Sequence, residues 1–184
     1  MEVAQEPTPT VLLAGDEASM YLQATTQNVW SPQGQTPIIR VDASRRKTNF
    51  YGTLNLLTGD ELALRADHLN SATSAFYLKC VLETYPGVHV IVFWDRAPWH
   101  HGPAIEGLLQ ANPRLEIIWY PVACPELNPQ EHVWKAARHE VSHNHDQADL
   151  DALANQFEHY LNCTHFESSF LDQYGYNQVR AMFS

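Results

Sequence analysis

The chain has 184 residues, 45% of them hydrophobic, and it carries 11 Lys and Arg against 21 Asp and Glu, a formal net charge of −10. This length and hydrophobic share are typical of one globular domain and exclude an intrinsically disordered chain. The acidic balance excludes a free-standing nucleic-acid-binding module of the usual basic kind, so affinity for DNA would need a local patch or another module.

Cysteine usage and hydropathy predict a cytoplasmic protein. The three cysteines are odd in number and widely spaced, at Cys80, Cys124 and Cys163. This spacing suits neither a disulfide framework nor a zinc ribbon. No apolar run reaches membrane-spanning length, and the first residues lack the basic and apolar parts of a signal peptide. We therefore expect the reducing cytoplasm and no membrane contact.

The first third of the chain has the pattern of short strands. Residues 1–10 are polar with two prolines, and we expect them to be a leader or linker to a single domain over residues 11–184. Short apolar runs predict strands over residues 11–14, 20–24, 49–57 and 61–65. The last two flank a Thr-Gly-Asp turn, which predicts a hairpin.

From residue 71 onward, helical and strand patterns alternate. Apolar residues at helical spacing predict helices over residues 71–84, 103–110, 129–143 and 147–161. The runs at 88–94 and 115–120 are nearly continuous in apolar residues, as expected for strands covered on both faces. This order predicts a mixed α/β layout in which helices cover a central sheet.

Three acidic residues share one kind of position at the end of an expected buried element. Asp16 follows the first strand, Asp95 follows the strand at 88–94, and Glu131 begins the helix at 129–143. Because neighbouring strand ends meet at one edge of an α/β sheet, we expect these acids to lie together. Carboxylate oxygens are ligands for Mg²⁺ or Mn²⁺ rather than zinc, and two such ions can assist phosphodiester cleavage.

The expected helix at 129–143 begins with a helix-capping pattern. Asn128 can cap a helix, Pro129 fits its first turn, and Glu131 stands three residues after the cap. This is a capping-box arrangement, which places a carboxylate at the positive end of a helix. Glu131 is therefore either a metal ligand or only the closing residue of the cap.

Three motifs resemble the DDE transposases of bacterial insertion sequences related to mariner. The first is Asp-Glu-Ala-Ser at 16–19, followed by Val-Trp-Ser-Pro-Gln-Gly at 29–34. The second is Phe-Trp-Asp-Arg-Ala-Pro-Trp-His at 93–100. The third is Pro-Glu-Leu-Asn-Pro-Gln-Glu-His-Val-Trp at 125–134, whose glutamate stands 36 positions after the second aspartate, as in that family.

The resemblance implies a ribonuclease-H-like fold with a central mixed five-stranded sheet flanked by helices. It also implies a two-metal-ion phosphoryl transferase and endonuclease that cleaves and joins DNA strands in transposition. Carried over onto this chain, Asp16, Asp95 and Glu131 are the catalytic residues and the ligands of two Mg²⁺ or Mn²⁺ ions. Glu17, beside Asp16, is the alternative ligand.

The same resemblance implies DNA partners, namely transposon ends and target. It implies a homodimer on DNA, and association with the bacterial nucleoid when DNA is bound. The N-terminal helix-turn-helix domains usual in the family have no counterpart in this sequence, so a separate helix-turn-helix chain could supply them. The alternative is a non-catalytic transposase remnant that acts as a DNA- or protein-binding module.

Further polar residues are candidates for substrate binding or for a rival site. The candidates for contacts with DNA are Arg45, Arg46, Lys47, Arg96, His100 and Asn128. The three consecutive cations could equally be a solvated turn, and the histidine could merely line a loop. His139 and His143 have the spacing of zinc ligands on one helix face, with His145 nearby, but a solvated helix end has the same pattern.

Overall fold

The computed structural model describes residues 9–35, 38, 45–122 and 124–166. Its five strands form one sheet in the order β3-β2-β1-β4-β5. They are β1 (Thr10–Tyr21), β2 (Lys47–Asn55), β3 (Glu61–Ala66), β4 (His89–Trp94) and β5 (Leu115–Trp119). β1 pairs antiparallel with β2 and parallel with β4, so the sheet is mixed, and the expected five-stranded sheet is confirmed.

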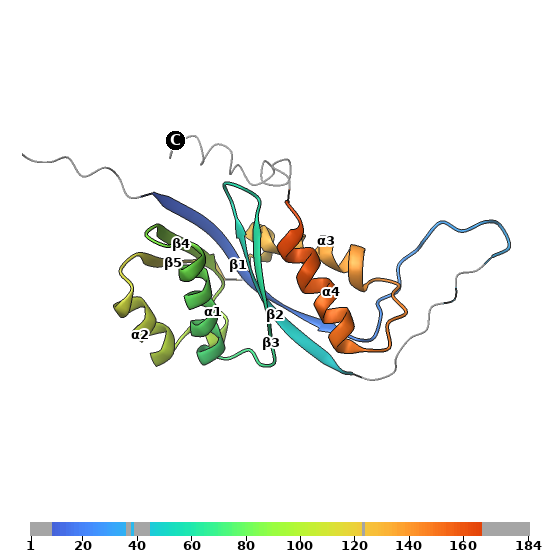
Figure 1. Cartoon of the computed structure of the whole chain (residues 1–184), viewed down its shortest axis with the longest axis horizontal. Coiled ribbons are helices and arrows are strands. Elements are labelled where there is room, and N and C mark those ends of the chain that lie inside the picture. The colour runs from blue at the N-terminus through green and yellow to red at the C-terminus, as the bar shows by residue number, and fades with distance from the viewer. Residues whose placement is uncertain (1–8, 36–37, 39–44, 123, 167–184) are drawn as a thin grey trace, which may run out of the picture.

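Helices cover both faces of this sheet (Figure 1). They are α1 (Ser71–Thr84), α2 (Pro103–Ala111), α3 (Gln130–Ala137) and α4 (Leu150–Cys163), with short turns η1 (Pro98–His100), η2 (Pro125–Leu127) and η3 (Arg138–Ser142). One core contains residues of α1 and α2, and a second core contains residues of α3 and α4. Among the described residues, no helix combines the length and hydropathy needed to cross a membrane.

The alternation of side chains along β1 separates these two cores. Leu12 and Ala14 belong to the core under α3 and α4, whereas Val11 and Leu13 belong to the core under α1 and α2. Successive strand residues point to opposite faces of a sheet. Asp16 and Glu17 therefore point to opposite faces, which separates their environments although they are neighbours in sequence.

The first strand differs from its prediction. Residues 11–14 and 20–24 were expected to be two strands separated by a Gly-Asp-Glu end, but β1 runs without a break from Thr10 to Tyr21. The expectation that Asp16 follows the strand is wrong, because Asp16 pairs with Gly52 of β2 within the ladder. Thr10 already belongs to β1, whereas the rest of the expected leader lies almost wholly outside the described residues.

The other elements agree with the sequence patterns more closely. The hairpin of β2 and β3 is confirmed, as are α1, α2 and α4. The helix predicted over 129–143 is α3 followed by the π-helical turn η3. β5 was expected to be covered on both faces, but it is the edge strand of the sheet, and Ile118 is 38% exposed there.

Candidate active site

The carboxyl end of β4 brings two of the predicted acids to one level of the sheet. In the parallel pair of β1 and β4, the last paired residues are Ala14 and Phe93. Asp16 and Asp95 each stand two residues beyond them, where β4 has ended and β1 continues beside β2. The two side chains thus reach the same edge by different routes, one from within a strand and one from a strand end.

A cavity of about 310 Å³ opens at this edge and is lined by all three predicted acids, Asp16, Asp95 and Glu131. The remaining lining residues come from the segments after β4 and β5 and from the start of α3: Arg96, Ala97, Tyr120, Pro121, Val122, Cys124, Pro125 and Asn128. The juxtaposition predicted from the three motifs is therefore present in the structure.

Asp16 is the most enclosed of the three acids. Its Oδ2 accepts a hydrogen bond from Trp134 Nε1 of α3 at 3.2 Å. Burial, followed by the charges of Glu17, Glu131 and Asp95, raises the pKa of Asp16 to about 7. This raised pKa reports the burial of Asp16 first and the negative charge around it second, and a bound cation would favour its ionised form.

Asp95 is held by hydrogen bonds at the mouth of the cavity. Its Oδ1 lies 2.8 Å from His100 Nδ1 and accepts a bond from the backbone N–H of Ala97 at 3.0 Å. The hydrogen bond from His100 is the largest cause that lowers the pKa of Asp95, against an opposing effect of burial. Asp95 is therefore ionised near neutral pH, as a metal ligand must be.

Glu131 is exposed in the first turn of α3. The predicted capping box is wrong, because the N-cap of α3 is Pro129 without a side-chain cap bond, and the backbone N–H of Asn128 donates to Pro125 O at 3.0 Å rather than to Glu131. The carboxylate of Glu131 has no hydrogen-bond partner among the described residues. It is therefore not consumed by the helix cap and can face the cavity that it lines.

Asn128 stands just before α3, whose N-cap is Pro129, and ties the start of the helix to β1. Its Oδ1 accepts from the backbone N–H of Gln130 at 3.1 Å, and its Nδ2 donates to Gly15 O at 3.3 Å. The residue is 5% exposed. Although Asn128 lines the cavity, both polar ends of its amide are used within the fold, so its contribution is to hold Glu131 beside Asp16.

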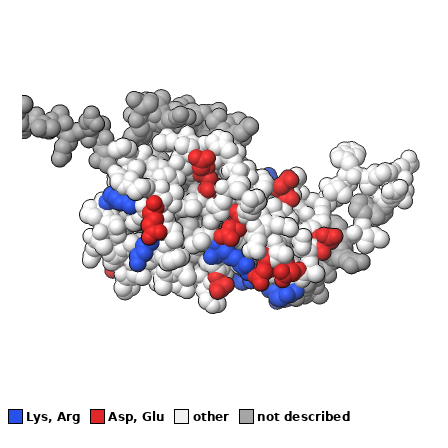
Figure 2. All heavy atoms as spheres, viewed as in Figure 1, with Lys and Arg blue, Asp and Glu red and all other residues white. Residues whose placement is uncertain are grey.

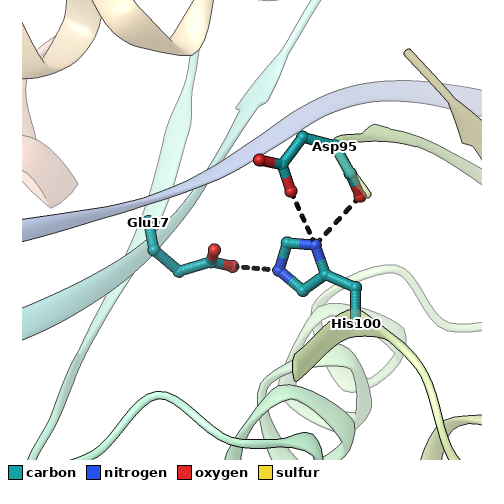
Figure 3. A group of neighbouring side chains, drawn as sticks. All are labelled: Glu17, Asp95 and His100. Carbon is teal, nitrogen blue, oxygen red and sulfur yellow. Dashed lines mark hydrogen bonds and ion pairs between the residues drawn. The ribbon is translucent and has the colours of Figure 1, made fainter. Parts of the chain in front are cut away.

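Glu17, the alternative ligand, lies on the other face of β1 and does not line the cavity. Its side chain is 4% exposed and accepts from Trp94 Nε1 at 3.2 Å, Trp99 Nε1 at 2.9 Å and His100 Nε2 at 2.8 Å. Figure 3 shows His100 between Glu17 and Asp95. The sequence analysis missed this role of Glu17, for which the only signal was an acid next to Asp16.

His100 is fully buried and so does not face the cavity as a surface contact. Burial acts to lower its pKa, but the hydrogen bonds with Asp95 and Glu17 outweigh it and raise the pKa to about 9. The imidazole is therefore protonated at neutral pH. Among the described residues, Glu17, Asp95 and His100 are the one group of acids, histidines or cysteines whose ligand atoms lie within 4.8 Å of one another.

The predicted basic residues are divided between two places. Arg96 is exposed and lines the cavity. Arg45, Arg46 and Lys47 are exposed where β2 begins, and Lys47 pairs with Tyr21, which lies about 17 Å along β1 from Asp16 at 3.3 Å per residue. On the face drawn in Figure 2, Lys and Arg stand beside Asp and Glu rather than in a continuous basic surface.

The three histidines of the rival zinc site lie in separate environments and do not share a partner. His143 Nδ1 lies 2.6 Å from Thr25 Oγ1, and His145 Nδ1 accepts from the backbone N–H of Gln147 at 3.1 Å. His139 is exposed on η3. Within the part of the chain that the structure describes, these three histidines do not form a metal-ligand group, and neither do Asp16, Asp95 and Glu131 by the same 4.8 Å criterion.

Comparison with known proteins identifies a family. Residues 11–154 match the family described as DDE superfamily endonuclease. An insertion element IS630 uncharacterized 39 kDa protein from Shigella sonnei is 24% identical over 147 residues, 79% of this chain and 43% of that protein. The resemblance to insertion-sequence transposases predicted from the three motifs is confirmed.

Two solved structures show the same fold. The Mos1 transposase paired-end complex with left transposon end has a TM-score of 0.65 and 16% identity, and the match covers 94% of this chain and 53% of that chain. The mariner Mos1 paired end complex with Mg has a TM-score of 0.66 and 15% identity, covering 94% and 55%. The ribonuclease-H-like fold is thus confirmed, and this chain spans about half the length of the proteins it matches.

Proposed function

The chain belongs to the DDE superfamily endonucleases, and from this premise we propose that it is the catalytic part of a transposase, which cleaves DNA strands and transfers them as an insertion sequence moves. The observation that carries the proposal is the lining of a single cavity by Asp16, Asp95 and Glu131. The likeness to an IS630 insertion-element protein supports the same assignment.

We assign Asp16, Asp95 and Glu131 as the residues that would hold Mg²⁺ or Mn²⁺, as two ions. The fit rests on the donor set, which is three carboxylates, and on the raised pKa of Asp16, to which the neighbouring negative charges contribute. A Mos1 complex described as containing Mg supports a divalent metal. When bound, such ions activate an attacking oxygen and stabilise the leaving oxygen in phosphodiester cleavage.

The chain's own groups orient the site for that chemistry. Asp95 is kept ionised by His100, and Asp16 is oriented by the indole N–H of Trp134. Arg96 lies exposed on the cavity, where a guanidinium can bind a phosphate oxygen of the DNA backbone. Tyr120, Pro121 and Val122 also line the cavity.

The proposed substrates are transposon ends and target DNA, bound by a homodimer on nucleoid DNA in the bacterial cytoplasm. The described association of Mos1 with a left transposon end supports this substrate class. The net charge of −10 supports recognition of the ends by a helix-turn-helix module rather than by this acidic domain alone.

Metal-dependent nicking of supercoiled plasmid tests the proposal, with and without an added helix-turn-helix chain. The wild type should nick with Mg²⁺ or Mn²⁺ and not with EDTA, whereas Glu131→Gln and Asp95→Asn should lose nicking and keep the fold. Glu140→Gln, at an exposed glutamate of η3, is the matched control and should retain activity. Full activity of Glu131→Gln would overturn the assignment, and a wild type inactive in both settings would favour the non-catalytic remnant.

A further inference from the structure

We infer that His100 is a positioning residue for Asp95, and that buried Glu17 holds His100 in place from the other side of its ring. The inference rests on the proposed function, because it concerns a carboxylate assigned there as a metal ligand. It gives roles to two residues that do not line the cavity themselves.

The bond pattern of the imidazole carries the inference. Nδ1 lies 2.8 Å from Asp95 Oδ1 and 3.0 Å from the backbone oxygen of Asp95, so it faces the side chain and the main chain of the same residue. Two contacts to one residue restrict rotation of its carboxylate. Figure 3 shows the second carboxylate oxygen of Asp95 directed away from His100, which leaves it available to the cavity.

Glu17 completes the arrangement from the opposite side of the ring. Nε2 of His100 lies 2.8 Å from Glu17 Oε1, so both ring nitrogens face oxygen atoms that accept hydrogen bonds. His100 is 0% exposed and the Glu17 side chain is 4% exposed, so Glu17 holds the imidazole from its buried side.

Two tryptophans hold this pair rigidly. The Trp94 ring stacks on His100 with centroids 3.8 Å apart, and the Trp99 ring meets it edge-on at 6.0 Å. Both indoles also donate to the carboxylate of Glu17. The resulting connection runs from β1 through the imidazole on η1 to the end of β4, and it fixes Asp95 from behind the cavity.

A metal ion bound by Glu17, Asp95 and His100 is the competing explanation of their closeness. The three ligand atoms do lie within 4.8 Å of one another. Both nitrogens of His100, however, are engaged in hydrogen bonds with the same carboxylates, and Glu17 already accepts two indole N–H bonds. An ion bound there would have to displace these hydrogen bonds, so the contacts favour positioning.

Loss of the hydrogen bond from His100 to Asp95 should weaken metal binding rather than abolish DNA nicking. Asp95 has a side chain that is 52% exposed, and without His100 it would be free to leave the orientation it now holds. Removal of such an outer partner typically weakens metal affinity by about 10–100-fold. We expect this range for the Mn²⁺ dissociation constant of His100→Gln.

The test is Mn²⁺ binding to the full chain by electron paramagnetic resonance, together with plasmid nicking over a Mn²⁺ series. His100→Gln and Glu17→Gln should raise the Mn²⁺ dissociation constant about 10–100-fold, and nicking should recover at high Mn²⁺. His101→Gln is the matched control, since that neighbouring exposed histidine lies against Trp119 with ring centroids 4.7 Å apart and has no hydrogen bond to Asp95 or Glu17 among the described residues, and its Mn²⁺ affinity should equal that of the wild type.

Near-UV circular dichroism of the buried tryptophans verifies that each variant is folded. If His100→Gln does not fold, Glu17→Gln tests the inference in its place. Unchanged Mn²⁺ affinity in a folded His100→Gln, or a loss of nicking that saturating Mn²⁺ does not restore, would overturn the inference while the proposed function stands. A wild type that binds Mn²⁺ but never nicks would overturn the proposed function instead. A wild type that binds no Mn²⁺ would overturn both.

Discussion

The indole N–H of Trp134 donates to Asp16 Oδ2 at 3.2 Å and thereby joins the acid of β1 to α3. Trp134 stands three residues after Glu131 on the same helix, so the two side chains lie on neighbouring positions of its surface. A single short helix thus carries one acid and orients another. A displacement of α3 would disturb both together.

Replacement of Trp134 by Phe should separate this orienting role from packing. Phe retains an aromatic ring in the core but removes the donor to Asp16, and the smaller ring should lower the free energy of unfolding by about 1–3 kcal/mol. We expect nicking to fall about tenfold at a metal concentration that half-saturates the wild type. Trp119→Phe, at a half-buried tryptophan of β5, is the control, and equal activity of both variants would contradict the role of Trp134.

Asn128→Ala should destabilise the chain and disconnect α3 from β1. The change leaves the backbone N–H of Gln130 and the backbone oxygen of Gly15 without their present partner, which costs about 1–3 kcal/mol. Urea unfolding measures this cost, and nicking below the unfolding transition should also decrease.

The matched control for this prediction is Asn112→Ala. That amide donates to Leu108 O at 2.8 Å at the end of α2, so it loses a bond of the same kind away from the acids. It should lower stability and leave nicking intact. A loss of activity in both variants would show that destabilisation alone explains the effect of Asn128→Ala.

The sequence predicted those features that depend on local pattern. The Thr-Gly-Asp turn between β2 and β3 and the apolar spacing in α4 each have a local cause, and both agree with the structure. The break expected after residue 14 does not exist, because pairing of Asp16 and Glu17 with β2 outweighs the low strand preference of acidic residues. That pairing is long-range and has no signature in residues 11–24.

In the candidate site, too, features with a local cause were predictable from the sequence and long-range features were not. The spacing between Asp95 and Glu131 could be read directly from the motifs. The cap predicted at Asn128 is instead at Pro129. The burial of His100 between two carboxylates could not be read from the motifs, since it depends on η1 folding back against β1. Nor could the position of Arg45, which depends on the lengths of β1 and β2 rather than on composition.

Gly52→Ala should disrupt the site, because Gly52 pairs with Asp16 and has no room for a side chain. An added Cβ would lie 2.6 Å from the Trp134 ring and closer still to Glu61 Oε1 and Gln130 Nε2. Overpacking of this kind costs about 1–3 kcal/mol, and the shift of Trp134 should reduce nicking as well. Thermal unfolding and the plasmid assay measure the two effects.

The control for this substitution is Gly107→Ala on α2. Apart from its chain neighbours and the backbone of its own helix, no atom lies within 4 Å of its added Cβ, and alanine favours a helix interior over glycine by about 0.5–1 kcal/mol. Gly107→Ala should therefore raise stability and leave nicking unchanged. Comparable stability of Gly52→Ala and the wild type would show that the segment around Trp134 yields without cost.

Glu61 gives the chain a pH-dependent stability that Glu61→Gln should remove. Its Oε1 accepts from Gln130 Nε2 at 2.6 Å, while Glu61 Oε2 and Gln130 Oε1 have no partner among the described residues. Burial raises the pKa of Glu61 well above its usual value of 4.5, and the nearby charge of Asp16 adds to this. A proton on Glu61 supplies a donor between two groups that otherwise only accept.

The direction of this pH dependence follows from the raised pKa of Glu61. Between its usual value and the raised value, the folded chain holds a proton on Glu61 that the unfolded chain has released. Stability is therefore greatest below about pH 4.5 with respect to this group, and it falls by up to about 1.4 kcal/mol per pH unit as the pH rises towards the folded pKa. The amide of Glu61→Gln is neutral throughout and can donate to Gln130, so the variant should lack this decline.

Urea unfolding of both chains from about pH 5 to about pH 8 measures the difference. The advantage of Glu61→Gln over the wild type should grow with pH, because the wild type either keeps a costly proton or ionises in an apolar site. Glu83→Gln, at an exposed glutamate of α1, should stay within about 0.5 kcal/mol of the wild type at every pH. A constant difference between Glu61→Gln and the wild type would mean that Glu61 is equally protonated in the folded and unfolded chains. That result would contradict the raised pKa of Glu61 and the prediction.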